Sequence, residues 1–169
     1  MILLTGDKHS GKTRFILELA QQTRLHGRRV AGIASPGFWK NGMRNGFELL
    51  DLDTGRRQLL SMRVPGLQPV PFMFDALGLE SGKKALSAAR CSRADLVIVD
   101  EVGPLELRGA GWAPCLKELL PLSAPLQIWV VRRSIAEKIQ AHFRIKAAWA
   151  DINQDNCMSG LLERLLQGP

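Results

Sequence analysis

The sequence predicts an α/β fold in which helices flank a mostly parallel β-sheet. Short continuous apolar runs such as Leu96–Val99 are typical of strands that are buried on both faces of such a sheet. Segments with apolar residues at helical spacing alternate with these runs, which is the element order of parallel α/β proteins. The 169 residues are enough for one sizeable core, so we expect a single domain over residues 1–169.

The beginning of the chain has the pattern of a strand–helix–strand unit. Ile2–Leu4 is a short apolar run, and Arg14–Leu25 carries apolar residues at helical spacing until Gly27 ends the pattern. Val30–Ala34 is again a strand-sized apolar run. These segments predict a βαβ unit with a glycine-bearing loop between its first strand and its helix.

The next segment predicts a β-hairpin excursion from the parallel sheet after the second strand. Phe47–Leu52 and Arg57–Met62 flank the turn residues Asp53-Thr54-Gly55. Val64–Pro71 contains three prolines and predicts a loop.

The second half of the chain continues the alternation of strands and helices. Strands are expected over Leu96–Val99, Leu126–Val131 and Ala147–Ile152. Helices are expected over Ser81–Ala94, over Trp112–Leu120, from a capping box at Ser134–Glu137 to about Phe143, and over Gly160–Leu166.

The composition argues against several classes of protein. No apolar run is long enough for a signal peptide or a membrane span, so we expect a cytoplasmic protein without membrane contact. Cys91, Cys115 and Cys157 lie far apart and predict neither a zinc site nor a disulfide framework. The formal net charge is +7, but the basic residues are scattered and are not interleaved with aromatic residues. Nucleic acid is therefore not the expected partner.

The loop after the first predicted strand matches the Walker A pattern G-x-x-x-x-G-K-[ST]. Its glycines let successive backbone N–H groups turn toward phosphate oxygens, and the following helix adds its positive end. Lys12 adds a full charge at the β- and γ-phosphates and is an expected catalytic residue. The expected nucleotide-binding residues are Gly6, Asp7, Lys8, His9, Ser10, Gly11, Lys12, Thr13 and Arg14.

The run Leu96–Glu101 has the Walker B pattern of four apolar residues followed by acids. Such acids lie at the carboxyl edge of the sheet, beside the Walker A loop. We expect Mg²⁺ as the cofactor, with Thr13 and Asp100 as its protein partners. Glu101 is the expected catalytic base that orients and deprotonates the attacking water. Glu106, five residues later, is an alternative base or a member of a structural salt bridge.

Four arginines are candidates for a clamp on the phosphates, because the developing charge of phosphoryl transfer rewards an added cation. The spacing singles out none of them. They are Arg44, Arg108, Arg132 and Arg133.

These motifs and their neighbours resemble one family. Asp100–Leu107 resembles the Asp-Glu-Ile-Gly-Pro-Met-Glu-Leu signature of the THEP-type, cancer-related nucleoside-triphosphatases. Gly37-Phe38 and Gly46–Gly55 are similar to that family's Gly-Phe and Gly-Phe-x-x-x-Asp-Leu stretches, and the element order matches from Met1 to about Asn156.

The resemblance implies a RecA-like P-loop NTPase core, Mg²⁺-dependent hydrolysis of nucleoside triphosphates and broad base tolerance. The family roles fall on Lys12 and Thr13 in the loop, on Asp100 at the metal and on Glu101 as base. The chain departs from the family pattern at four positions, and these departures predict slow turnover with intact phosphate binding. Lys8 replaces a proline, His9 a glycine, Arg14 a threonine and Cys157 an arginine.

The expected activity is therefore slow, Mg²⁺-dependent conversion of ATP, GTP or another nucleoside triphosphate to its diphosphate and phosphate. Two alternatives stay open. A nucleotide-gated accessory protein would bind tightly, with incidental hydrolysis and a protein partner that sets its function. A small-molecule kinase would need an acceptor site and usually an arginine-rich lid, and Arg132-Arg133 instead precede a predicted helix.

Overall fold

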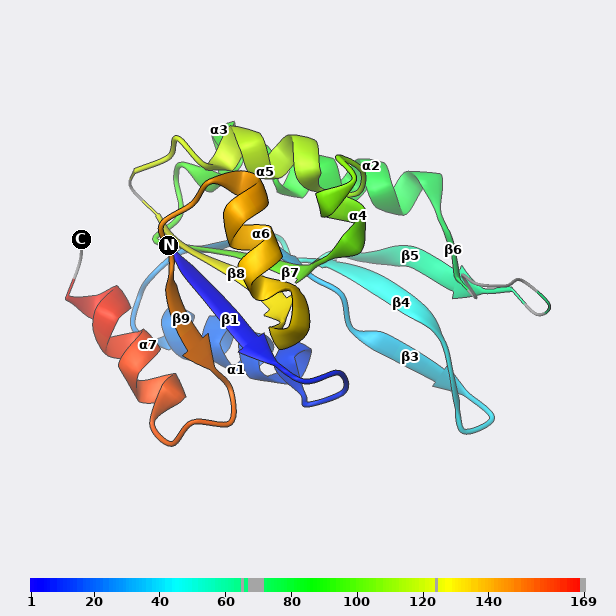
Figure 1. Ribbon diagram of the computed structural model, residues 1–169, viewed down its shortest axis with the longest axis horizontal. Helices are drawn as coiled ribbons and strands as arrows, with labels where there is room; N and C mark the ends of the chain where they lie inside the picture. The colour runs from blue at the N-terminus through cyan, green and yellow to red at the C-terminus, as the bar shows by residue number, and fades with distance from the viewer. Residues whose placement is uncertain (65, 67–71, 124, 168–169) are drawn as a thin grey trace.

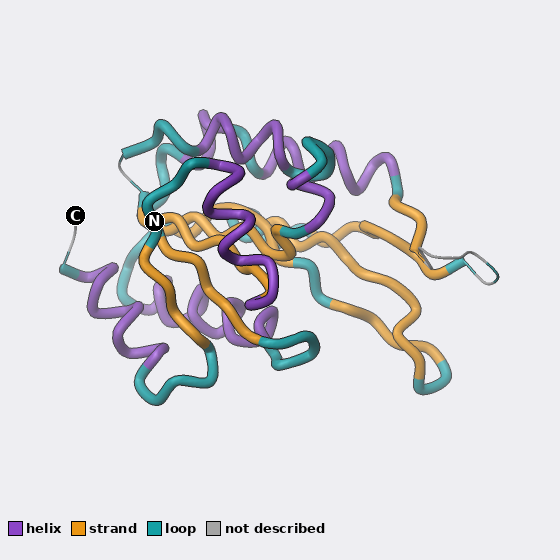
Figure 2. Tube along the Cα trace, in the orientation of Figure 1, coloured by secondary structure: helices purple, strands orange, loops and turns teal. Residues whose placement is uncertain are grey.

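The computed structural model describes residues 1–64, 66, 72–123 and 125–167, and in this part the chain forms one mixed sheet between two layers of helices (Figures 1 and 2). Nine strands run in the order β6-β5-β4-β2-β7-β8-β1-β9, with β3 paired to β4. Helices α1 and α7 cover one face, and α2 to α6 cover the other (Figure 1). The expected α/β class is confirmed.

Five parallel strands form the core of the sheet. Their register places β8 between β1 and β7. The predicted strands are all present, and β1 and β7 run two and three residues beyond the predicted ends at Leu4 and Val99. The strands are β1 (Ile2–Gly6), β2 (Val30–Ala34), β7 (Leu96–Val102), β8 (Leu126–Arg132) and β9 (Ala148–Asp151).

Four antiparallel strands form an extension that we call the β-arm: β3 (Gly37–Lys40), β4 (Met43–Asp51), β5 (Arg57–Arg63) and β6 (Phe72–Phe74). The predicted hairpin is its β4–β5 pair. The β-arm continues the main sheet because β4 pairs antiparallel with β2, and it projects from the globular part (Figure 1). Most of the loop predicted at Val64–Pro71 lies outside the described residues.

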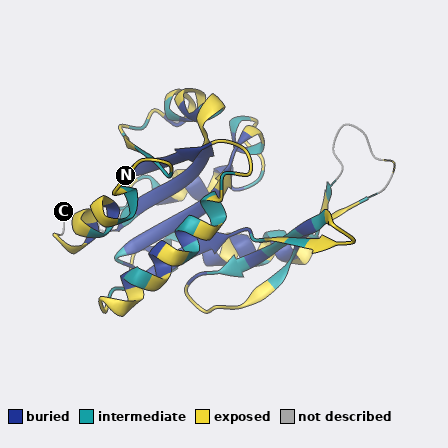
Figure 3. Ribbon diagram, turned by 90° about the horizontal axis from the view of Figure 1, so that it is seen from below, coloured by how far each residue is buried: buried dark blue, intermediate teal, exposed yellow. Residues whose placement is uncertain are grey.

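Strand side chains alternate between two apolar cores, as a sheet covered on both faces requires. Leu3, Val97 and Trp129 belong to the core under α5 and α6. Their neighbours Leu4 and Ile98 belong to the core under α1 and α7. The central strands are accordingly buried along most of their length, whereas the β-arm carries many exposed residues (Figure 3).

The helices are α1 (Lys12–Leu25), α2 (Ala76–Ala85), α3 (Ala88–Cys91), α4 (Pro104–Leu107), α5 (Ala113–Leu119), α6 (Ala136–Phe143) and α7 (Cys157–Leu166). No helix within the described ranges is long and apolar enough to cross a membrane.

Two helix predictions were wrong in detail. The single helix expected over Ser81–Ala94 is instead α2 and α3, and α2 begins earlier, where Asp75 Oδ2 accepts a hydrogen bond from Gly78 N at 2.8 Å. Gly78 and Gly82 weakened the helical pattern in the sequence. The fold needs both glycines. A Cβ on Gly78 would lie 2.1 Å from the Leu59 carbonyl oxygen, and a Cβ on Gly82 would lie 2.4 Å from the Trp112 ring.

The expected capping box at Ser134–Glu137 is also absent. Arg133–Ile135 forms a 3₁₀ turn, and α6 begins after Ile135 without a side-chain cap. The helix nevertheless ends at Phe143, as predicted.

Candidate active site

The candidate site lies at the carboxyl edge of the parallel strands, where α/β proteins bind ligands. The Walker A loop leaves β1 at Gly6 and enters α1 at Lys12. Gly11 has φ 90°, a left-handed conformation that suits glycine, and an added Cβ there would meet nothing within 4 Å. The start of α1 has no side-chain cap and no acidic residue in its first turn. The first N–H groups of α1 therefore have no side-chain acceptor and are suited to bind an anion.

The Lys12 ammonium group bends back over the loop. Its Nζ donates hydrogen bonds to the carbonyl oxygens of Gly6 at 3.1 Å and Asp7 at 2.6 Å. Burial lowers the pKa of Lys12, and the negative charges of Glu101 and Asp100 raise it in part. The loop carbonyls hold the cation and the two acids attract it, and it can exchange the carbonyl acceptors for phosphate oxygens.

Asp100 joins three segments that are distant in the sequence. Its Oδ2 accepts hydrogen bonds from Thr13 Oγ1 at 2.9 Å and Ser35 N at 3.0 Å, and its Oδ1 accepts one from Glu101 N at 2.9 Å. The side chain is buried, and this burial, followed by the charge of Glu101, raises its pKa to about 6.

The adjacent Thr13 hydroxyl and Asp100 carboxylate are hard oxygen ligands of the type that Mg²⁺ prefers. No group of three or more metal-ligating side chains occurs in the residues that the structure describes.

Glu101 occupies a strained position at the end of β7. Its φ is 56°, a conformation that side chains larger than glycine rarely adopt. The pairing of β7 with β8 shifts between Val99 and Val102, so Glu101 lies in an irregular part of the strand and is exposed. Such local strain is often found at functional sites.

Glu106 is occupied by structural contacts. It is buried, and its two carboxylate oxygens accept hydrogen bonds from Gly103 N at 2.7 Å and Trp112 N at 2.9 Å. Burial raises its pKa, against the effect of these bonds. Gly111 leaves room for it, since a Cβ there would lie 2.2 Å from Glu106 Oε1. Glu106 thus shapes the turn after β7.

The four candidate arginines separate into two groups. Arg133 pairs with Asp151, and Arg108 is exposed at the end of α4. Arg132 is the register partner of Gly6 across the β1–β8 pair, at the start of the Walker A loop. Arg44 lies on β4. The pKa of His9 in the loop is lowered first by desolvation and then by the positive charges of Arg44, Lys8, Arg132 and Lys12.

The remaining loop residues present backbone or exposed side chains. Asp7, Lys8, His9 and Arg14 are exposed, and Ser10 Oγ donates to the Asp7 carbonyl at 2.8 Å. His9 has φ 66°, a left-handed conformation at a position where the resembling family carries glycine.

Sequence reasoning missed Ser35, whose backbone N–H helps to hold Asp100. Its position in the sequence could have indicated it, because Ser35 follows an apolar strand and precedes Pro36, at the carboxyl end of β2.

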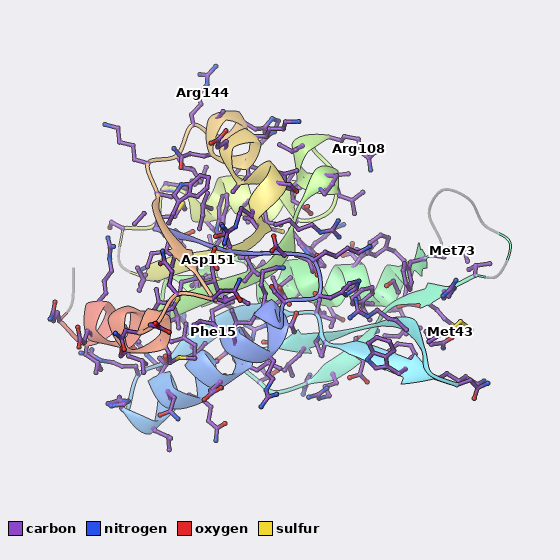
Figure 4. The ribbon with its side chains drawn as sticks, turned by 60° about the horizontal axis from the view of Figure 1, so that its bottom comes forward. Phe15, Met43, Met73, Arg108, Arg144 and Asp151 are labelled. Atoms are coloured by element: carbon purple, nitrogen blue, oxygen red, sulfur yellow. The ribbon has the colours of Figure 1, made fainter. Side chains whose placement is uncertain are left out.

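A groove of about 540 Å³ lies beside the loop, between α1 and the start of α7. Phe15 and Ile152 line the end of it near the loop, and Ile152 is close to Gly6, since a Cβ on Gly6 would lie 3.0 Å from Ile152 Cγ1. Phe15 and Asp151 occupy this region in Figure 4, whereas Arg108 and Arg144 lie on the opposite helical layer.

Comparison with known proteins adds a family. A family model described as NTPase matches residues 1–162. The nucleoside-triphosphatase THEP1 of Methanopyrus kandleri is 32% identical over 134 residues, which cover 79% of this chain and 74% of that protein. The THEP1 of Methanosarcina barkeri is 30% identical over 159 residues, or 92% and 89%.

Two solved structures share the fold. The solution structure of a human cancer-related nucleoside triphosphatase has a TM-score of 0.72 and 21% identity, covering 96% of this chain and 93% of that one. The crystal structure of THEP1 from Aquifex aeolicus has a TM-score of 0.70 and 16% identity, covering 97% and 100%.

Proposed function

The chain belongs to the NTPase family of nucleoside-triphosphate hydrolases, and from that premise we propose that it hydrolyses ATP, GTP and other nucleoside triphosphates with Mg²⁺, slowly and with broad base tolerance. The observation that carries the proposal is the 2.9 Å hydrogen bond between Thr13 and Asp100. It joins the phosphate loop to the acid at the end of β7, as a triphosphate with its metal requires.

In this proposal the loop N–H groups and Lys12 bind the phosphates. Lys12 exchanges its two carbonyl acceptors for β- and γ-phosphate oxygens. Thr13 and Asp100 are the residues that would hold Mg²⁺, which neutralises phosphate charge when bound. The three hydrogen bonds to Asp100 keep its carboxylate in place.

Glu101 is the proposed base. Its exposed carboxylate directly follows Asp100, and its charge raises the pKa of Lys12, so it is suited to a place beside the γ-phosphate. It accepts a proton from the attacking water as the water oxygen bonds to the γ-phosphorus. Glu106 is unsuited to this role, because both of its oxygens are engaged by backbone N–H groups.

Three features support slow, base-tolerant turnover. His9 strains the loop that must hold the phosphates. The groove near Phe15 and Ile152 offers apolar contact of a kind that every nucleobase can make. The Asn-Lys-x-Asp signature of guanine selectivity is missing from the sequence.

The test is Mg²⁺-dependent phosphate release across ATP, GTP, CTP and UTP, with EDTA and Glu101→Gln as controls. Similar rates for the four nucleotides, lost in both controls, are expected. Tight binding with no release above the Glu101→Gln level would instead favour the nucleotide-gated accessory protein. The β-arm gives that second candidate one specific support, namely the exposed apolar side chains of Trp39, Met43 and Met73.

A further inference from the structure

Arg44 on the β-arm is a cation without an acidic partner. It enters no ion pair in the described part of the chain, and the residues outside it contain no Asp or Glu side chain. Its Nε is buried and meets no acceptor among the described residues. The buried Nε without an acceptor is costly, and an anion that pairs with the terminal nitrogens of the same guanidinium group offsets part of this cost.

The structure holds this guanidinium group in one place. Its Cζ lies 5.0 Å from the centroid of the Trp39 ring and 5.2 Å from that of the Phe47 ring. Both distances are within the range of cation–π attraction. Gly37 completes the packing, because a Cβ there would lie 3.0 Å from Arg44 Nε. The side chain is therefore preorganised, which reduces the entropy lost when it binds a ligand.

The position of this group is tied to the active site. Strand β3 starts two residues after Ser35, whose N–H binds Asp100 at 3.0 Å. Because the strand order is β4-β2-β7-β8-β1, the β-arm and the Walker A loop flank the end of β7 from opposite sides. The charge of Arg44 is also among the causes that lower the pKa of His9 in the loop, which agrees with this placement.

We propose that Arg44 binds the γ-phosphate of the nucleoside triphosphate and stabilises its charge during hydrolysis, with Trp39 and Phe47 as positioning residues. The inference rests on the proposed function and names the residue that recognises a triphosphate rather than a diphosphate. In the reaction, the water oxygen bonds to the γ-phosphorus, the bond from that phosphorus to the β–γ bridging oxygen breaks, and the proton passes to Glu101. Arg44 gives and takes no proton.

The first test compares Arg44→Ala with Arg63→Ala, which removes an exposed arginine from β5 of the same β-arm. Calorimetry with a non-hydrolysable triphosphate analogue and with the diphosphate gives the preference for the third phosphate. Arg44→Ala should reduce this preference about tenfold or more, at nearly unchanged diphosphate affinity. Turnover at saturating substrate should fall on the order of 10²-fold or more. Arg63→Ala should match the parent in both measurements.

A second set of variants separates positioning from folding. Arg44→Lys keeps the charge but loses the planar two-point donor, so its turnover should lie between those of parent and Arg44→Ala. Added guanidinium ion should partly restore Arg44→Ala but not Glu101→Gln. Trp39→Ala should lower kcat while diphosphate affinity holds, and Trp39→Phe should recover most of the loss because it restores an aromatic face.

Two results overturn the assignment. One is an equal loss of diphosphate and triphosphate affinity in Arg44→Ala, which makes Arg44 a general anion attractor. The other is a parent-like triphosphate preference and rate in Arg44→Ala. Failure of the hydrolysis proposal can be distinguished from these results. If the parent binds triphosphate without turnover, its preference for triphosphate over diphosphate can still be measured, and loss of that preference in Arg44→Ala supports the inference.

Discussion

Replacing Glu101 by glutamine should separate the chemical step from both binding and folding. The substitution keeps the size of the side chain and removes its basicity. It leaves the Glu101 N–H bond to Asp100 in place, and the exposed side chain makes no hydrogen bond of its own in the described residues. We therefore expect folding stability within about 0.5 kcal/mol of the parent, as for other surface substitutions.

The expected loss of turnover is roughly 10²-fold or more, the scale of removing a general base, or about 2.7 kcal/mol of transition-state stabilisation. Nucleotide affinity should hold or increase, because a negative charge near the phosphates is removed. Single-turnover phosphate release measures the first effect, and calorimetry measures the second. Parent-like release by Glu101→Gln would refute the assignment of the base.

Glu106→Gln is the matched comparison. An amide has one acceptor oxygen, so its NH₂ group would face one of the two backbone N–H donors of Gly103 and Trp112. A buried donor without an acceptor costs about 1–3 kcal/mol. This variant should lose that much unfolding free energy in a denaturant titration and keep most of its turnover. A stable Glu106→Gln protein with a dead chemical step would transfer the role of base to Glu106.

Four further substitutions or conditions test the remaining parts of the site. Lys12→Ala should lose on the order of 2–5 kcal/mol of triphosphate binding by calorimetry, whereas Lys8→Ala, whose side chain is exposed, should lose much less; equal effects would contradict the role of Lys12. Asp100→Asn should weaken binding in Mg²⁺ more than binding in EDTA, because the amide lacks the charge that holds a hard cation; an equal effect in both would remove Asp100 from the metal site. Without metal, the folded protein should lose stability as the pH rises from about 4 to about 6, because burial raises the pKa of Asp100 from 3.8 to about 6 and the folded state keeps a proton that the unfolded state has released; urea titrations of the parent and of Asp100→Asn should differ in this window. His9→Gly should add about 1 kcal/mol to the free energy of unfolding, because glycine adopts φ 66° without strain; an unchanged melting temperature would show that the loop carries no such cost.

The sequence predicted those parts of the site that are set by contiguous residues. The Walker A loop and the strand that ends in Asp100 each have a recognisable local pattern, and the structure brings Thr13 and Asp100 to hydrogen-bond distance as the combination predicts. The roles of these residues stay predictions. The family assignment made from Asp100–Leu107 is confirmed by the match over residues 1–162.

The features that were missed depend on contacts between distant segments. The start of α2 was lost because Gly78 and Gly82 lower helix propensity, and their value appears only where α2 packs within reach of Leu59 and Trp112. Ser35 contributes a backbone N–H, which no residue type in the sequence can announce. Arg44 was among the four candidate arginines, but the sequence could not single it out, because its contacts with the rings of Trp39 and Phe47 appear only once β3 and β4 pair.

Residues with an unusual backbone conformation mark the candidate site. Among the residues that the structure describes, five other than glycine have positive φ. Asn41 and Asn156 are of a type that tolerates this conformation, and Arg144 ends α6. Neither explanation covers His9 or Glu101, which belong to the Walker A loop and to the end of β7, the two segments of the candidate site. Strain at these two positions is held in place by the buried sheet beneath them. Substitutions of His9 and Glu101 should therefore change turnover or loop strain while the apolar core stays intact. Substitutions of buried Glu106 should instead lower the free energy of unfolding and leave most of the turnover.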